Sequence, residues 1–172
     1  GAASMAGERR DMTVLFADIR GLTAIAEQLS ATELKDLLNR FFTPMTRVIF
    51  GHHGTVDKYV GGRIMAFWGA PLECPDHPRQ GVKAALAMQE EARRLRFQLQ
   101  REGLPDVSMG IGLNSGPMSV GNMGSEFRRN YTVLGDAVNL GARLEGLTRY
   151  YGAAIVVSDV TREGLEEEIL FR

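Results

Sequence analysis

The chain lacks several features that would point to particular classes of protein. Its single cysteine, Cys74, excludes an internal disulfide and suits a reducing compartment, so we expect a cytoplasmic domain. No apolar run reaches the roughly 18 residues of a membrane-spanning helix, so we expect no membrane contact here, although a parent chain can be anchored elsewhere. A formal net charge of −1 gives no electrostatic reason to expect nucleic acid as a partner. The three histidines lack metal-site spacing.

The length of 172 residues suits one globular domain with one core. We expect residues 1–7 to be an expression remnant or linker, and residues 8–172 to form the domain. Periodicity predicts strands at 12–18, 55–60, 64–69, 107–115, 118–123, 130–135 and 154–158, and helices at 22–29, 31–50, 78–102, 136–149 and 159–168. The leading β-α-β-β-α-β order is typical of an α+β, ferredoxin-like fold, an antiparallel sheet with helices packed on it and additional strands.

The stretch YTVLGDAVNLGARLE, residues 131–145, carries the most information. A β-branched run meets Gly-Asp, and a helix begins with Asp136 as its expected N-cap. Leucines at helical spacing, with Ala137, form a stripe expected to face the core: Leu140, Leu144 and Leu147. Asn139 and Arg143 lie four residues apart and project together away from that stripe. An amide beside a guanidinium suits a phosphate ester, although a polar pair alone is more often plain helix surface.

A second segment, residues 12–23, is an apolar strand that ends on the carboxylate of Asp18. Carboxylates are preferred Mg²⁺ ligands, and the ion usually takes one or two of them together with substrate phosphates. Gly21, Leu22 and Thr23 then lead into a helix whose first N–H groups can receive phosphate oxygens. The alternative is that Asp18 is an ordinary turn or capping residue.

A third segment, residues 55–68, is typical of a hairpin in which two β-branched or aromatic runs flank Gly61-Gly62. Alternation places Lys58 on the same strand face as Val56 and Val60. A lysine between two valines either extends to the sheet edge or serves a ligand.

Together the segments resemble the catalytic domain of class III nucleotidyl cyclases, in particular the bacterial adenylate cyclases. Four stretches in family order between residue 13 and about residue 148 carry the resemblance. They are TVLFADIRGLT, GTVDKYVG–IMAFWGAP, GIGLNSGPMSVGNMGSEFRRNYTVLGDAVNL and ARLEGLT. The resemblance implies conversion of ATP to 3′,5′-cyclic AMP and pyrophosphate in a site shared across a head-to-tail homodimer, and a regulatory domain in a longer parent chain.

The resemblance also implies roles for single residues. Asp18 and the backbone carbonyl of Ile19 match the metal ligands, which hold two Mg²⁺ or Mn²⁺ ions in the family. The segment Gly21–Thr23 lies where the triphosphate binds. Asn139 and Arg143 match the pair that orients the ribose and stabilises the pentavalent phosphorus as the 3′-hydroxyl attacks.

Base choice follows from two further matches. Lys58 corresponds to the lysine that reads adenine, and guanylate-specific relatives tend to have an acidic residue there. Thr132 lies seven residues before Asn139, at the second purine-reading position, where many bacterial members have threonine. The pair implies ATP as the substrate.

The sequence also departs from the family. Metal-competent members have Gly-Asp at the hairpin tip, and that aspartate is the second metal ligand, whereas this chain has Gly61-Gly62-Arg63. A segment with a Lys-Gly-Lys stretch, which follows residue 172 in relatives, has no match here. The departures leave two alternatives to an active cyclase. One is a catalytically silent domain that binds nucleotide or dimerises; the other, a diguanylate cyclase, is disfavoured because Arg63-Ile64 replaces the acidic residues which that family requires.

Overall fold

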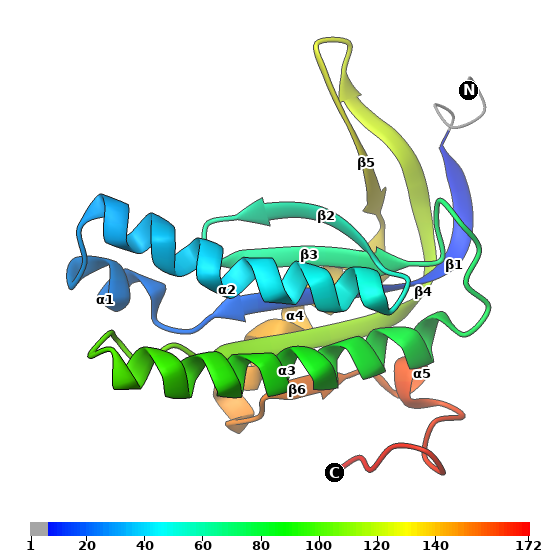
Figure 1. The fold of residues 1–172 in the computed structure, drawn as a ribbon. Coiled ribbons are helices and arrows are strands. Elements are labelled where there is room, and N and C mark those ends of the chain that lie inside the picture. Colours follow the sequence, from blue (N-terminus) through cyan, green and yellow to red (C-terminus); the bar gives the residue numbers. More distant parts are fainter. Residues whose placement is uncertain (1–6) are drawn as a thin grey trace.

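The computed structural model describes residues 7–172 and contains six strands and five helices within them (Figure 1). In chain order the elements are β1 (Glu8–Ile19), α1 (Leu22–Glu27), α2 (Ala31–Gly51), β2 (Thr55–Val60), β3 (Arg63–Trp68), α3 (His77–Arg101), β4 (Met109–Ser125), β5 (Arg128–Leu134), α4 (Asp136–Tyr151), β6 (Ile155–Val157) and α5 (Asp159–Arg162).

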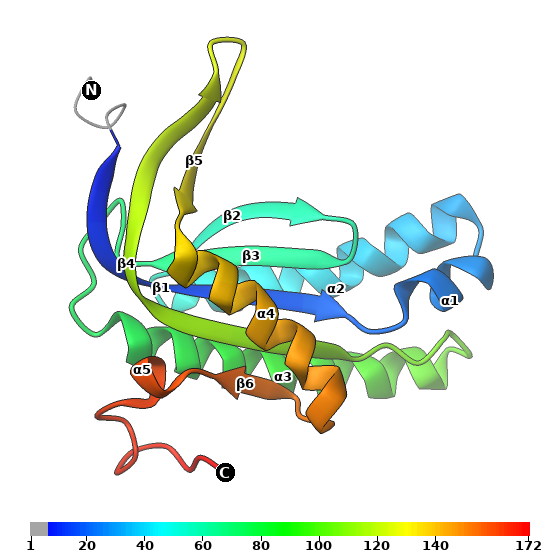
Figure 2. The ribbon, with the colours of Figure 1, turned by 180° about the vertical axis from the view of Figure 1, so that it is seen from behind.

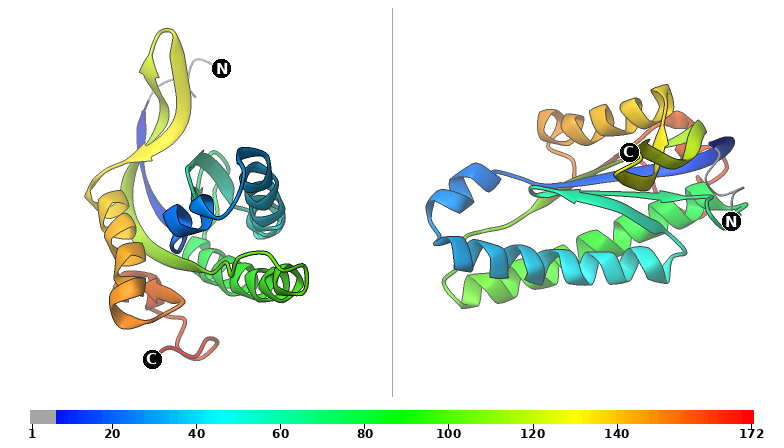
Figure 3. Two further views of the ribbon diagram at one scale, coloured as in Figure 1. Left: turned by 90° about the vertical axis from the view of Figure 1, so that its left-hand side faces the viewer. Right: turned by 90° about the horizontal axis from the view of Figure 1, so that it is seen from above.

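The strands form one sheet in the order β2-β3-β1-β4-β5, with β6 paired to β4. The pairs along the main path are antiparallel and the β4–β6 pair is parallel. The predicted α+β fold, with a mostly antiparallel sheet covered by helices, is confirmed. Helices α2 and α3 lie on one face of the sheet and α4 on the other, as the end-on view shows (Figure 3, left).

Strand β1 separates the two hydrophobic clusters because successive side chains of a strand point to opposite faces. Leu15, Ala17 and Ile19 face α2 and α3 and belong to the larger cluster. Val14 and Phe16 face the other way, into a second cluster beside α4 and β5. Asp18 has the same parity as Phe16, so the strand delivers its carboxylate to the α4 face.

Helix α4 lies against the sheet through glycines on both sides of the contact. A Cβ at Gly112 of β4 would lie 2.2 Å from the backbone N of Glu145, and one at Gly141 would lie 2.8 Å from Val14 Cγ1. The expected leucine stripe is therefore wrong: the buried residues of α4 are Val138, Gly141, Glu145 and Thr148. Small and polar residues face the sheet because the backbones approach too closely for leucine.

Three further expectations need correction. The predicted strands at 107–115 and 118–123 form one continuous strand, β4, because Gly116-Pro117 does not turn the chain and Pro117 stays in register with Asp11. The last helix ends at Arg162, since Gly164 takes a left-handed conformation two residues later. The N-cap of α4 is Gly135, and Asp136 is its first helical residue.

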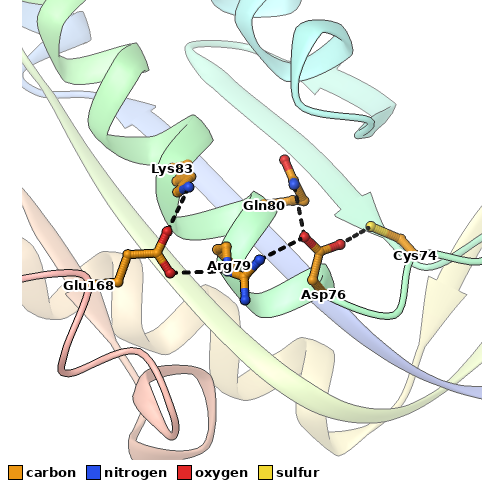
Figure 4. A network of polar contacts seen from close by, with 6 residues as sticks. All are labelled: Cys74, Asp76, Arg79, Gln80, Lys83 and Glu168. Atoms are coloured by element: carbon orange, nitrogen blue, oxygen red, sulfur yellow. Dashed lines mark hydrogen bonds and ion pairs between the residues drawn. The ribbon is translucent and has the colours of Figure 1, made fainter.

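The C-terminal segment is tied to the start of α3 by ion pairs (Figure 4). Glu168 accepts from Arg79 Nε at 3.1 Å and from Lys83 Nζ at 2.7 Å. All three side chains are partly exposed, so each pair stabilises the fold by only about 0–1 kcal/mol. Among the helices that the structure describes, none is long and apolar enough to cross a bilayer.

The β4–β5 hairpin extends beyond the body of the molecule (Figures 1 and 2). Its tip carries Phe127, whose side chain is 92% exposed. A two-stranded ribbon with little packed on it has marginal stability by itself. Beyond the body of the molecule, the ribbon is therefore held mainly by the pairing of β4 with β5.

The close approach of α4 gives a stability prediction. Gly112→Ala should lower the free energy of unfolding by about 1–3 kcal/mol or more, because the new methyl group meets backbone that cannot give way. Gly146→Ala is the matched control within α4, where a Cβ meets nothing within 4 Å, and should raise it by about 0.5–1 kcal/mol. Urea unfolding measures both; a Gly112→Ala chain as stable as wild type would contradict this packing.

Candidate active site

The end of β1, the start of β3 and helix α4 bring three charged side chains together on the α4 face. Asp18 is opposite Arg63 in the β1–β3 register and opposite Gly110 in the β1–β4 register. Arg63 Nη2 donates to Glu145 Oε1 of α4 at 3.1 Å, and its guanidinium lies 4.9 Å from the centre of the Phe16 ring. Sequence, register and helix packing thus place two acids around one guanidinium.

Glu145 is the buried member of this group, with 4% of its surface exposed. Burial raises the pKa of the Glu145 carboxyl, and the negative charge of Asp18 raises it further, while the hydrogen bond and positive charge of Arg63 lower it. Arg63 Nε is buried without a hydrogen-bond partner among the described residues. Through its hydrogen bond from Nη2, Arg63 offsets part of the negative charge of Glu145.

The hairpin tip lies directly beside the start of α1. Ile19 N donates to the carbonyl of Gly62 at 2.9 Å, and a Cβ at Gly62 would lie 2.8 Å from Leu22 Cδ2. Gly61 has a φ of 58°, whereas Gly62 is outside the left-handed region, as in a type II′ turn. Gly21 caps α1 in the left-handed conformation and Thr23 is exposed. The predicted Gly21–Thr23 segment and the tip are therefore neighbours.

A β-bulge changes the orientation expected for Lys58. Val56 pairs with Ala66, but Lys58 pairs with Met65, so Asp57 is the extra residue. Because paired residues share a face, Lys58 lies on the opposite face from Val56. The prediction that the two share a face is wrong; the bulge places Lys58 on the face that also holds Arg63, two residues before Met65.

Asp57 itself contacts β5. The hydroxyl of Thr132 donates to Asp57 Oδ2, and Lys58 Nζ lies 3.7 Å from Asp57 Oδ1. The side chain of Asp57 is fully buried, whereas that of Lys58 is 47% exposed. Burial raises the pKa of Asp57, while the Thr132 hydrogen bond and the Lys58 charge lower it. Two sequence-predicted residues, Lys58 and Thr132, are thus joined through a third that sequence analysis missed.

Asn139 and Arg143 are both exposed on α4, and neither side chain has a hydrogen bond or ion pair within residues 7–172. Glu145, two residues further on, is the α4 residue that reaches the Asp18 and Arg63 group. One chain therefore presents three separate elements: the Asp18 group, the Lys58–Asp57–Thr132 group, and the uncommitted pair on α4.

The donor set at the end of β1 suits one divalent ion better than two. Asp18 is a partly exposed carboxylate beside the Ile19 backbone, but the other nearby acid, Glu145, is committed to Arg63. Within the described residues there is no cluster of three or more His, Cys, Asp or Glu side chains that could hold a metal. The residues do not fit an ion held by a second carboxylate at the hairpin tip.

A groove of about 710 Å³ lies elsewhere, between α2 and Tyr59 of β2. Its walls are largely apolar and none of the predicted site residues lines it. Tyr59 pairs with Ile64, so it points to the α2 face, away from Lys58. The groove and the charged residues Lys58 and Arg63 therefore lie on opposite faces of the β2–β3 hairpin.

Comparison with known proteins identifies the family of this chain. The sequence matches the family model of the adenylate and guanylate cyclase catalytic domain over residues 5–172, and the chain belongs to that family. Adenylate cyclase 1 of Rhizobium meliloti (strain 1021) is 30% identical over 164 residues, which cover 95% of this chain and 25% of that relative. The chain thus spans about a quarter of the length of that curated relative.

Solved structures agree on the fold and include both base specificities. The adenylyl cyclase CyaB from P. aeruginosa superposes with a TM-score of 0.91 at 33% identity, covering 98% of this chain and 86% of that chain. The guanylyl cyclase Cya2 superposes with a TM-score of 0.85 at 38% identity, covering 92% and 80%. The resemblance inferred from the sequence motifs is confirmed, and the base preference is open on similarity alone.

Two functional candidates escaped the sequence analysis for identifiable reasons. Asp57 was missed because regular alternation was assumed along β2. The signal for a bulge was the adjacent charged pair Asp57-Lys58 within a six-residue strand. Glu145 is spaced with Val138 and Gly141 on one helix face, but the more hydrophobic leucines obscured that face.

Proposed function

We propose that the chain is an adenylate cyclase domain that converts ATP to 3′,5′-cyclic AMP and pyrophosphate by attack of the ribose 3′-hydroxyl on the α-phosphorus. Family membership carries the reaction class. The arrangement of Lys58, Asp57 and Thr132 is the observation that favours ATP. Phosphoryl-type transfer needs mainly positioning and charge stabilisation, which suits the residue types present.

Each group has a role in this proposal. Arg143 stabilises negative charge on the α-phosphate oxygens, and Asn139 orients the ribose. Lys58 and Thr132 contact the purine edge. The turn at Gly21–Thr23 lies against the phosphates. Asp18 and the Ile19 carbonyl would hold Mg²⁺ or Mn²⁺, which when bound activates the hydroxyl and offsets phosphate charge.

We infer a head-to-tail homodimer as the working form. Asn139 and Arg143 have no side-chain partners among the described residues, and Asp18 in the same chain lies beside Glu145 instead. The protruding hairpin with Phe127 supports contact with a second copy. An isologous dimer makes two equivalent sites by symmetry, each with Asp18 from one chain and Asn139 and Arg143 from the other. A regulatory domain elsewhere in a longer chain is also part of the proposal.

One observation favours a second candidate, a cyclase-like domain that binds nucleotide without turning it over. Gly62 supplies no carboxylate at the hairpin tip, and Arg63 occupies the surroundings of Asp18 through its ion pair with Glu145. A guanidinium beside the metal carboxylate weakens cation binding by charge repulsion. Formation of cyclic AMP separates the two candidates.

The test compares three chains at saturating ATP with Mg²⁺ or Mn²⁺. We expect slow cyclic AMP formation by wild type, best with Mn²⁺, and an increase of up to about three orders of magnitude in Gly62→Asp, because a second carboxylate supplies several kcal/mol of charge stabilisation. Gly62→Asn is the matched control: it meets the same Leu22 contact without a charge. Equal rates in Gly62→Asp and Gly62→Asn would show that the tip is not a metal site. If no chain forms cyclic AMP, the second candidate, a domain that binds nucleotide without turning it over, is supported.

A shared site predicts recovery on mixing. Asp18→Ala and Asn139→Ala should each be inactive, while an equal mixture should regain about a quarter of the parent activity, since half of randomly formed dimers are mixed and each has one intact site. The measurement uses the more active of the wild-type and Gly62→Asp backgrounds. Mixing Asp18→Ala with Lys58→Ala shows which chain supplies the base contact. Absence of recovery in the first mixture, with both chains folded, would contradict the homodimer.

Base choice gives a further prediction. Lys58→Glu should reduce the preference for ATP over GTP by at least about tenfold, because an acceptor replaces the donor that faces purine N1. Lys58→Met, which has similar length and no charge, should fall between wild type and Lys58→Glu. Unchanged relative rates with ATP and GTP in Lys58→Glu would mean that Lys58 only covers the sheet edge.

A further inference from the structure

We propose that Asp57 is a positioning residue for base selection: its carboxylate holds the hydroxyl of Thr132 with the oxygen lone pairs directed at the purine, which favours a 6-amino purine over a 6-oxo purine. The inference rests on the proposed function and concerns the same site. It assigns a residue to the choice of base that acts through Thr132 and need not contact the nucleotide.

The first step is the location of Asp57. It is the extra residue of the β2 bulge, and its side chain is fully buried next to β5. A bulge redirects side chains locally and is frequent beside functional sites. Here the bulge brings the side chains of two adjacent residues together. Asp57 is buried, Lys58 is half-exposed, and their charged ends lie 3.7 Å apart.

The second step is the direction of the hydrogen bond. A carboxylate only accepts, so Thr132 must be the donor in its contact with Asp57 Oδ2. The proton of the hydroxyl is then directed into the protein. Thr132 is 8% exposed, and the lone pairs of its oxygen are left for a group on the accessible side. A threonine without such a partner rotates its hydroxyl and can donate or accept equally well.

The third step is the chemistry of the purine edge. Adenine presents an acceptor at N1 and a donor at its 6-amino group, whereas guanine and hypoxanthine present a donor at N1 and an acceptor at O6. Lys58 supplies a donor, and Thr132, fixed by Asp57, supplies an acceptor. The two side chains therefore complement adenine, and either 6-oxo base leaves both polar pairs mismatched in a partly buried place.

The surroundings of Asp57 give its carboxylate few partners besides Thr132. Oδ1 is buried without a hydrogen-bond partner among residues 7–172, and the nearest cation, Lys58 Nζ, is 3.7 Å away. Burying a carboxylate with an unsatisfied oxygen lowers stability. Fixing the polarity of the Thr132 hydroxyl is a role that a carboxylate can fill, because it only accepts, whereas an amide can also donate and an aliphatic side chain can do neither.

The experiment measures dissociation constants for three nucleotides that cannot cyclise: the 3′-deoxy forms of ATP, ITP and GTP. Inosine differs from adenosine at position 6 and N1 but lacks the 2-amino group of guanosine, so it isolates the edge that Thr132 faces. Wild type should bind the adenine nucleotide at least about tenfold more tightly than the hypoxanthine one, the effect of one or two matched hydrogen bonds. Asp57→Asn should lose most of this ratio, because an amide can donate to or accept from Thr132.

Matched variants separate this role from a general structural one. Asp36→Asn, an exposed acid of α2, should leave the ratio unchanged. Thr132→Ser keeps the hydroxyl and should keep the preference, while Thr132→Val should lose it. In the Thr132→Val background, Asp57→Asn should have no further effect on the ratio, because Asp57 acts through that hydroxyl. If Asp57→Asn binds too weakly to measure, Asp57→Ser replaces it in the same cycle.

The outcomes distinguish a failure of the proposed base choice from a failure of the role of Asp57. A wild-type chain with no preference between the adenine and hypoxanthine nucleotides overturns both the proposed base choice and this inference. A wild-type chain that prefers adenine, with an Asp57→Asn chain that keeps the same ratio, overturns the inference alone. An Asp57→Asn effect of equal size with and without the Thr132 hydroxyl also overturns it, since Asp57 would then act by another route.

Discussion

Direct contact between the backbones of α4 and β4 is the constraint on which the rest of this structure depends. Gly110 and Gly112 leave room for the helix, since a Cβ at either would lie within about 2.2 Å of α4 atoms. Helices more often rest on sheets through branched side chains that keep the axes about 10 Å from the strands. Here the separation is smaller, and the charged residues of α4 and of the strand ends come within hydrogen-bonding distance.

That proximity has an electrostatic consequence. The sheet-facing side of α4 places Glu145 beside Asp18, and two acids in a partly buried place repel one another. Arg63 relieves the repulsion by its hydrogen bond to Glu145 and its stacking on Phe16. Because Arg63 is part of the chain, its positive charge is present whatever the concentration of divalent ions. The charge around Asp18 is therefore set largely by the sequence.

The sequence allowed the architecture to be predicted but not the orientation of its parts. Strand, hairpin and helix positions followed from periodicity and from Gly61-Gly62, because these signals are local. The face of α4 did not follow, because burial of Glu145 and Thr148 depends on glycines in β4, some thirty residues earlier. The side of Lys58 did not follow because one extra residue in β2 inverts the alternation. The motif residues were recognisable by spacing, whereas Asp57 required the contact between β2 and β5.

The β2 bulge makes the site unusually sensitive to chain length. Removing one residue between Lys58 and Gly61 would pair Asp57 with Met65 and Lys58 with Ile64, which restores regular alternation and turns Lys58 to the α2 side of the sheet, where the apolar groove lies. Asp57, Lys58 and Thr132 would all remain in the sequence, but Lys58 would point away from the face that holds Arg63. A deletion in this strand can thus rearrange the site while each of these residues stays readable in the sequence.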